Sequence, residues 1–200
     1  MSKQILLINC AYRVGSIIDQ MMQEVAINIQ RSGYTYEMLN LREQEFSHCV
    51  NCRVCTQKDG ENPGECINRD KMNDIVKLIE QSAGYVIASP AKFYATAKFF
   101  ECFLSRLIVY SYWPFGTKTP IPKKHLTKKA VLICAFPIPE FIAKIYSKTI
   151  NQLKTCAKLI GAQPIETIYI ALTPISSDRK LSQKEKEQAK NASEKLIASL

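Results

Sequence analysis

Apolar residues recur along the chain with two different spacings, one typical of buried strands and the other of amphipathic helices. Short continuous apolar runs predict strands, whereas apolar residues at every third or fourth position predict helices. Strands are expected at residues 4–9, 34–40, 84–88, 130–136 and 165–171. Helices are expected at residues 16–33, 70–81, 98–109, 141–159 and 182–200. Residues 110–128 hold several prolines and a glycine and predict a long loop.

Strands that alternate with helices predict a parallel sheet, because each connection between neighbouring strands has to cross over through a helix. The expected fold class is therefore α/β, a doubly wound three-layer sandwich with a five-stranded parallel sheet, formed by residues 1–200 as a single domain. Such sheets bind ligands beyond the carboxyl ends of their strands, where the strand order reverses. A site is expected in the segments that follow the strands, at residues 10–16, 41–69, 89–97 and 136–140.

Some of the element boundaries have specific signals. Ser16 with Asp19, and Ser182 with Glu185, have the spacing of a capping box, in which a serine and an acidic residue three positions later satisfy N–H groups at a helix start. The dipeptide Ser89-Pro90 is expected to break the third strand.

Composition and charge narrow the class of protein. The chain is 46% hydrophobic and 22% charged, which is typical of a globular protein. No apolar run reaches the length of a membrane span, so we expect a cytoplasmic protein without a membrane partner. The net charge of +9 is scattered and accompanies no nucleic-acid-binding motif, so we expect no nucleic acid.

The segment Cys10–Ser16 leads from the first strand into a capped helix. Such a loop directs backbone N–H groups and the positive helix end at one point, which suits a phosphate. Arg13 and Ser16 can add a guanidinium and a hydroxyl. An ordinary turn with an exposed arginine and a capping serine is the alternative. The segment has neither the Walker nor the GxGxxG pattern, so ATP and classical dinucleotide binding are not indicated.

Eight cysteines are many for a chain of this length, and without an export signal they are expected to be thiols or metal ligands rather than disulfides. Four lie in one segment, as Cys49, Cys52, Cys55 and Cys66. They can be inert or redox-labile thiols, ligands of a [4Fe–4S] cluster, or ligands of zinc. Because a long gap precedes Cys66, we expect no cluster. Cysteines 10, 102, 134 and 156 are expected in the core.

Taken in order, several segments resemble one known family. They are Cys10–Arg13 with Ser16–Ile18, the cysteines 49, 52 and 55, Cys66 followed by Asp70–Met72, and Ser89–Arg106. With these motifs the chain resembles the NADPH-dependent FMN reductase and iron–sulfur flavoprotein branch of the flavodoxin-like superfamily, over roughly residues 4–172.

The resemblance implies that FMN binds with its phosphate on Ala11–Ile18 and its ring against Pro90–Thr96. Ala11 and Ile18 stand where the family has Ser and Thr, and Lys92 stands where it has an aromatic residue. No catalytic side chain is predicted, because the flavin would supply the chemistry. The residues expected to contact FMN are Ala11, Arg13, Ser16, Ile17, Ile18, Pro90, Ala91, Lys92, Phe93, Tyr94, Ala95, Thr96 and Phe136.

The function implied is an NAD(P)H-dependent oxidoreductase that passes electrons to a small acceptor, namely a quinone, nitro, azo or ferric compound. Two alternatives stay open, an iron–sulfur flavoprotein-type electron carrier that uses the four-cysteine segment and a flavodoxin-like module that has lost its flavin. The lysines of residues 118–129 form a basic stretch that we expect near the mouth of the sheet, where it would favour NADPH over NADH; a solvated loop is the alternative. We also expect a homodimer or tetramer, for which the aromatic residues of Tyr110–Phe115 provide a candidate interface.

Overall fold

The computed structural model describes residues 4–91, 98–137, 148–171 and 179–200. Short 3-10 turns occur at Leu41–Glu43, Val54–Thr56 and Leu107–Tyr110. The main elements are β1 (Gln4–Asn9), α1 (Ile17–Arg31), β2 (Thr35–Asn40), α2 (Met72–Gln81), β3 (Gly84–Pro90), α3 (Lys98–Arg106), β4 (Ser111–Tyr112), β5 (Ile121–Pro122), β6 (Lys128–Ala135), α5 (Lys148–Leu159), β7 (Ala162–Ile170) and α6 (Gln183–Ala198).

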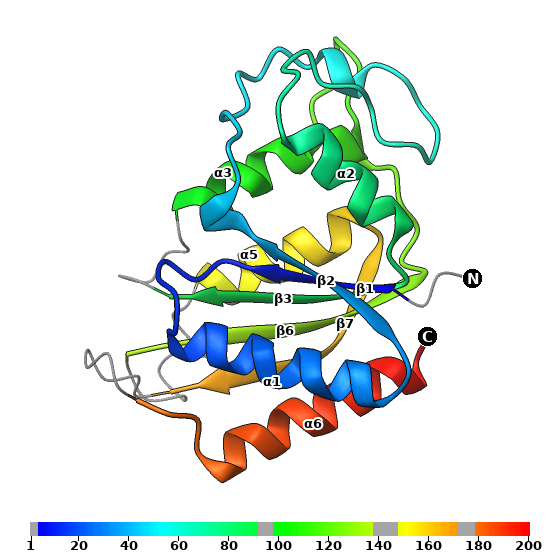
Figure 1. Ribbon diagram of the computed structural model, residues 1–200. Helices are drawn as coiled ribbons and strands as arrows, with labels where there is room; N and C mark the ends of the chain where they lie inside the picture. The colour runs from blue at the N-terminus through cyan, green and yellow to red at the C-terminus, as the bar shows by residue number, and fades with distance from the viewer. Residues whose placement is uncertain (1–3, 92–97, 138–147, 172–178) are drawn as a thin grey trace.

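Strands β1, β2, β3, β6 and β7 form one parallel sheet in the order β2-β1-β3-β6-β7, which is the flavodoxin-like order. Helices α1 and α6 cover one face, and α2, α3 and α5 cover the other (Figure 1). The predicted doubly wound three-layer sandwich with a five-stranded parallel sheet is confirmed. The order reverses between β1 and β3, because β2 lies on one side of β1 and β3 on the other.

Side chains of β1 alternate between the two layers of the core. Leu6 and Ile8 pack with the α2, α3 and α5 layer, whereas Ile5 and Leu7 pack with the α1 and α6 layer. All four are fully buried, as expected for a strand covered on both faces. The continuous apolar run that predicted this strand from the sequence therefore reflects burial on two sides.

Strand β3 continues beyond the residue at which the sequence analysis ended it. Ser89 pairs with Cys134 and Pro90 with Ala135, so the prediction that Ser89-Pro90 breaks the strand is wrong. A proline removes only one N–H from the ladder, and Pro90 is the last residue of β3, where this loss is tolerated. The strand thus reaches further toward its carboxyl edge than expected.

Several other boundaries differ from the expected ones. Helix α3 ends at Arg106 and is followed by a 3-10 turn, and the loop expected at 110–128 contains the short antiparallel pair β4–β5. Strand β7 begins three residues early at Ala162, and the register shifts between Ala130 and Val131, opposite Pro164. Pro164 has no N–H for the ladder, so an irregularity at this point is expected.

The two capping boxes have different outcomes. Ser182 and Glu185 form both reciprocal hydrogen bonds, as predicted. The hydroxyl of Ser16 accepts the N–H of Asp19 at 3.3 Å, but the carboxylate of Asp19 accepts the N–H of Gly15 instead of that of Ser16. The first box is therefore only half formed, and Asp19 is available for other contacts.

A buried ion pair joins the two helices α2 and α3 to the connection that follows β2. The side chain of Arg106 is 1% exposed and donates to both carboxylate oxygens of Asp70, at 2.7 and 3.0 Å. Arg106 also donates to the carbonyl of Ser47 at 2.8 Å, and Asp70 accepts the N–H groups of Ser47 and Met72. Burial alone raises the pKa of Asp70, but the hydrogen bonds from Arg106, Ser47 and Met72 outweigh it and lower that pKa.

Replacing Arg106 with alanine is expected to lower the free energy of unfolding by about 3–5 kcal/mol, because Asp70 keeps its charge but loses its partner. Urea unfolding followed by circular dichroism measures this change. The matched control is Arg69→Ala, at an exposed arginine next to Asp70 in sequence, which is expected to change stability by no more than about 0.5 kcal/mol. Equal effects of the two substitutions would contradict the role given to the ion pair.

Candidate functional site

The carboxyl ends of β1, β3, β6 and β7 lie side by side at one edge of the sheet. The N–H of Cys10 donates to the carbonyl of Ala88, that of Ala91 to Ala135 and that of Phe136 to Ile170. The loop after β1 and the end of β3, which the sequence placed at one ligand site, are therefore neighbours. Of the residues predicted there, Lys92, Phe93, Tyr94, Ala95 and Thr96 lie outside the described residues.

The loop after β1 presents several exposed residues at the start of α1. Arg13 is exposed, and within the part of the chain that the structure describes its guanidinium has no hydrogen-bond or ion-pair partner. Gly15 has a φ of +73°, a conformation that side chains other than glycine rarely adopt. An unpaired guanidinium beside the positive end of a fifteen-residue helix is a suitable donor set for an anion.

Two other predicted contacts are part of the core. Ala11 is 0% exposed and Ile18 is 1% exposed, and both pack in the layer formed by α1 and α6. The N–H of Ala11 donates to the side-chain oxygen of Asn9 at 3.0 Å. Neither side chain can replace the hydroxyl donors that the family has at these positions, so an anion here depends on Arg13, Ser16 and backbone N–H groups.

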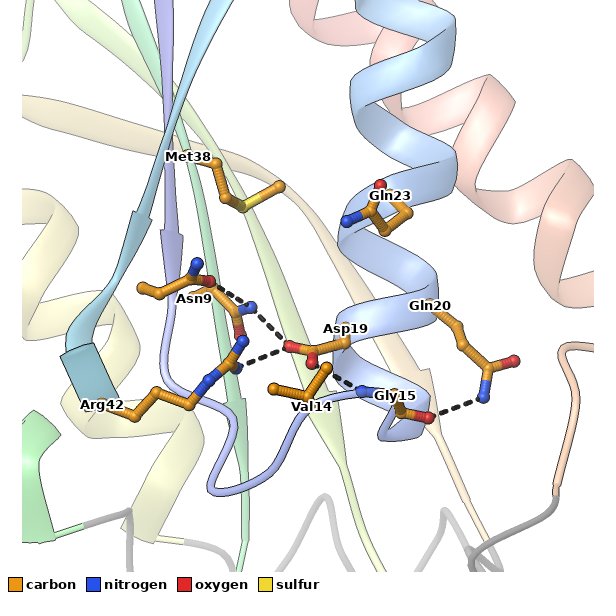
Figure 2. A pocket seen from close by; sticks show the side chains of 9 residues that line it. Asn9, Val14, Gly15, Asp19, Gln20, Gln23, Met38 and Arg42 are labelled. Carbon is orange, nitrogen blue, oxygen red and sulfur yellow. Dashed lines mark hydrogen bonds and ion pairs between the residues drawn. The ribbon is translucent and has the colours of Figure 1, made fainter.

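Behind the loop, the carboxylate of Asp19 is the centre of a polar network (Figure 2). Its Oδ1 accepts from Nδ2 of Asn9 at 2.6 Å and from Nη1 of Arg42 at 2.8 Å, and its Oδ2 accepts the N–H of Gly15 at 2.9 Å. Asn9 also donates to Oδ1 of Asn40 at 2.9 Å. The side chains of Asp19 and Arg42 are only 10% and 14% exposed, so this network fixes the loop after β1 from inside the protein.

The sequence analysis missed most of this network, although the sequence contains a signal for it. Asn9 and Asn40 are the last residues of two strands, and they are directly opposite each other in the β1–β2 register. A polar residue at the end of a buried apolar strand needs a hydrogen-bond partner. Once β1 and β2 are paired in parallel, their two asparagines indicate a polar cluster at this end of the sheet.

A cavity of about 250 Å³ opens between α1 and β2, directly over this network. It shares Val14 and Gly15 with the loop after β1 but contains none of the predicted flavin contacts. The residues that line it are Asn9, Val14, Gly15, Asp19, Gln20, Gln23, Met38, Asn40 and Arg42.

On the other flank of the loop, the predicted ring-side residues are only partly accessible. Pro90 is half-buried and Ala91 is buried. The ring of Phe136 is 1% exposed and stacks on Tyr169 with the ring centroids 6.3 Å apart. This ring is therefore part of the core, and its assignment to a flavin site stays a prediction, as do those of Pro90 and Ala91.

The four-cysteine segment packs as an ordered unit. Cys55 is buried, and Cys49, Cys52 and Cys66 are half-buried. Burial first, and then the thiols of these three cysteines, raise the pKa of Cys55 to about 11, so this side chain is a neutral thiol at pH 7. Among the residues that the structure describes, no three His, Cys, Asp or Glu side chains are grouped as a metal site requires. The other cysteines, 10, 102, 134 and 156, are buried as predicted.

The residues around Cys52 and Cys55 adopt uncommon backbone conformations. Asn51 and Arg53, on either side of Cys52, have φ values of +53° and +59°. A Cβ atom on Gly64 would lie 1.7 Å from the carbonyl oxygen of Cys55, so only glycine fits there. The N–H of Asn51 donates to Sγ of Cys49 at 3.4 Å. The long gap before Cys66 is thus folded back onto Cys55 at Gly64.

The aromatic segment at 110–115 covers this unit. The guanidinium of Arg53 lies 3.9 Å from the ring centroid of Trp113 and donates to the carbonyl of Trp113 at 2.8 Å. Tyr110 is fully buried, whereas Phe115 is 66% exposed. The expected aromatic interface patch is therefore smaller than the sequence indicated.

The lysines expected to favour NADPH mostly have internal partners. Lys124 pairs with Glu80 at 2.6 Å, Lys128 donates to the carbonyl of Ile79 at 3.0 Å, and Lys123 is buried. Because β6 begins at Lys128, these lysines lie at the amino end of that strand, away from the candidate site. The expectation that they lie near the ligand-binding edge is wrong for these three residues.

The sheet order and the loop at its switch point define a flavodoxin-like α/β protein. The sequence matches the NADPH-dependent FMN reductase family over residues 4–173, and the chain belongs to this family. The predicted family and its oxidoreductase class are thereby confirmed. None of the helices among the described residues combines the length and the apolar character needed to cross a bilayer.

Individual relatives are distant. An iron–sulfur flavoprotein of Archaeoglobus fulgidus is 25% identical over 95 residues, which are 48% of this chain but only 41% of that protein. An FMN-dependent NADH-azoreductase from Bacillus anthracis str. Ames Ancestor, solved with FMN, has a TM-score of 0.70 and 12% identity, covering 98% of this chain and 100% of that chain. An NAD(P)H:quinone oxidoreductase from Methanothermobacter marburgensis has a TM-score of 0.64 and 15% identity, covering 96% of this chain and 97% of that chain. Structural similarity at 12–15% sequence identity establishes the fold alone.

The family binds FMN, and the donor set after β1 fits the phosphate of that group. Arg13 is exposed and unpaired within the described residues, and Ser16 is half-buried at the first turn of α1. The carboxylate of Asp19, which would repel a phosphate, is paired with Arg42 and is 10% exposed. The residues present therefore fit an external anion at the loop, with fewer hydroxyl donors than the resemblance implied.

The four-cysteine segment is expected to hold neither an iron–sulfur cluster nor zinc, because no three potential ligands among the described residues are grouped closely enough for a metal. Iron, sulfide and zinc analysis of protein purified in air and under anaerobic conditions measures this. Near-stoichiometric iron and sulfide after anaerobic purification would contradict the prediction, and their loss in Cys55→Ser would locate the cluster.

Proposed function

We propose that this protein binds FMN at the carboxyl edge of the sheet and passes electrons from NAD(P)H to a small acceptor. The observation that carries the proposal is the exposed Arg13 before α1, which has no partner among the described residues, in a chain that belongs to the NADPH-dependent FMN reductase family. Bound FMN would supply hydride acceptance and electron donation, which no amino-acid side chain provides.

The protein's own residues have three tasks in this proposal. Arg13, the hydroxyl of Ser16 and the first N–H groups of α1 bind the phosphate. The network of Asp19 with Arg42 keeps the loop in one shape, so that binding does not have to order it. The end of β3 at Pro90 and Ala91 supports the flavin ring.

The acceptor is proposed as a small oxidant of the quinone, nitro, azo or ferric class. The names of the similar structures include an azoreductase and a quinone oxidoreductase, which supports this chemical class without selecting one member. We further propose a cytoplasmic homodimer or tetramer, in which the exposed Phe115 lies at a subunit interface.

A second candidate function is electron carriage of the iron–sulfur flavoprotein type. It is favoured by the close approach of Gly64 to Cys55 within the four-cysteine segment and by the partial match to the flavoprotein of Archaeoglobus fulgidus. The two functions differ in the electron donor, since a carrier would not use a nicotinamide. A third possibility, a module without flavin, is supported by the buried Ala11 and Ile18.

NADH or NADPH is expected to bleach FMN-loaded protein within seconds, and a quinone is expected to restore the colour, because hydride transfer follows once the reacting atoms of the two rings are aligned about 3–3.5 Å apart. Anaerobic stopped-flow absorbance with each nucleotide measures the rate. A flavin that stays oxidised with both nucleotides but accepts electrons from a reduced ferredoxin would replace the reductase with the carrier. Protein that takes up no FMN would support the third possibility, a flavodoxin-like module without flavin.

Arg13→Ala is expected to weaken FMN binding by about 1–3 kcal/mol, the contribution of one hydrogen bond between charged groups. Fluorescence titration of FMN with the apoprotein measures the dissociation constant. Arg31→Ala is the matched control, since Arg31 is an exposed arginine at the opposite end of α1. Equal affinities of the two variants would remove Arg13 from the phosphate site.

A further inference from the structure

The cavity between α1 and β2 is not used by the flavin site proposed above, although it adjoins the same loop. It lies on the β2 side of that loop, whereas the ends of β3 and β6 lie on the other side. Val14 and Gly15 belong to the loop and also line the cavity, so they lie between the cavity and the proposed phosphate site at Arg13. A ligand in the cavity would therefore lie beside a phosphate bound at Arg13 without occupying the same space.

As far as the structure describes the chain, the floor of the cavity carries no unpaired charge. The carboxylate of Asp19 is neutralised by Arg42, and its two oxygens accept three hydrogen bonds. The amide of Gln20 donates to the carbonyls of Gly15 and Arg179 and accepts the N–H of Leu181. A floor whose polar groups are already satisfied favours an uncharged ligand over an ion.

The walls near the opening have a different character. Val14 is 80% exposed and Met38 is half-buried, and both offer apolar surface to a flat ring. Gln23 is exposed, and within the described residues its amide makes no hydrogen bond. Figure 2 shows Met38 of β2 and Gln23 of α1 pointing toward one another across the opening. The cavity thus combines apolar walls with one free amide donor and acceptor.

Size limits the ligand to a single ring system. A volume of about 250 Å³ is below the roughly 300–1,000 Å³ of pockets that enclose whole drug-sized ligands. A glutamine amide matches the edge of adenine, because its oxygen accepts from the exocyclic N6 while its nitrogen donates to N7. Guanine has an acceptor where adenine has the N6 donor, so the same amide cannot pair with it in this way.

We propose that this cavity binds the adenine ring of the NAD(P)H co-substrate, with Gln23 on the edge of the base and Met38 against its face. The inference rests on the proposed function for the identity of the ligand, since NAD(P)H is the participant that carries an adenine. The base would lie on the β2 side of the loop, and the reactive nicotinamide would reach the opposite side, toward Pro90. Gln23 is then a specificity residue for the co-substrate and takes no part in electron transfer.

Adenosine, which has no phosphate, is the probe that separates this cavity from the anion site. Ligand-observed NMR titrations with FMN-loaded protein, and with flavin-free protein if no FMN is taken up, give its dissociation constant. Gln23→Ala is expected to weaken adenosine binding by about two- to tenfold, the range of one neutral hydrogen bond. Gln30→Ala, at another exposed glutamine of α1, is the matched control and is expected to bind adenosine as the unmodified protein does.

The outcomes distinguish this inference from the proposed function. Adenosine binding that is weakened by Gln23→Ala but unchanged in Arg13→Ala supports the cavity, whatever happens to the flavin. In an active reductase, Gln23→Ala is then expected to raise the KM for NAD(P)H at unchanged kcat. No adenosine binding, equal binding in Gln23→Ala and Gln30→Ala, or equally tight binding of guanosine would overturn the proposal, even if NAD(P)H reduces the flavin.

Discussion

The buried carboxylate of Asp19 is shared by the end of β1, the loop after it and the turn after β2. It accepts hydrogen bonds from Asn9, Gly15 and Arg42, which belong to these three segments. Breaking this arrangement would leave a charge in a place that is only 10% exposed, which is costly in a protein interior. The shape of the loop proposed to bind an anion, and the floor of the adjoining cavity, therefore depend on one side chain at the start of α1.

Most of the fold could be predicted because its central strands, β1, β3 and β6, are buried on both faces. Runs such as residues 5–8 and 84–88 are continuously apolar, and helices such as α1 have clear start and end signals. Boundaries set by long-range pairing could not be predicted in this way. Pro90 lies within a strand because β6 pairs with it, and β7 begins early because the ladder tolerates an irregularity at Pro164. Local sequence contains no information about either partner.

The candidate site was predictable in part, for a similar reason. The position of Arg13 after β1 follows from the alternation of strands and helices alone. The pairing of Arg106 with Asp70 brings together two motifs on which the family resemblance depended, but their contact is visible only in three dimensions. For the lysines at 123–128 the sequence predicted a ligand-binding role that the structure does not support. Their side chains instead pair with Glu80 of α2 and donate to nearby backbone carbonyls. A run of basic residues in the sequence does not show at which edge of the sheet those residues will lie.

The replacement of two hydroxyl residues by Ala11 and Ile18 changes how this chain can hold an anion. In the family pattern the side chains at these positions donate to the phosphate, whereas here both are buried in the core. Because an alanine or isoleucine cannot donate, the proposed attraction for a phosphate would come from Arg13, the hydroxyl of Ser16 and the N–H groups of α1. These long-range charges are screened by salt more strongly than short hydrogen bonds in a closed pocket. The internal pairing of Asp19 with Arg42 is then essential, since an unpaired carboxylate in the first turn of α1 would cancel much of the remaining positive potential.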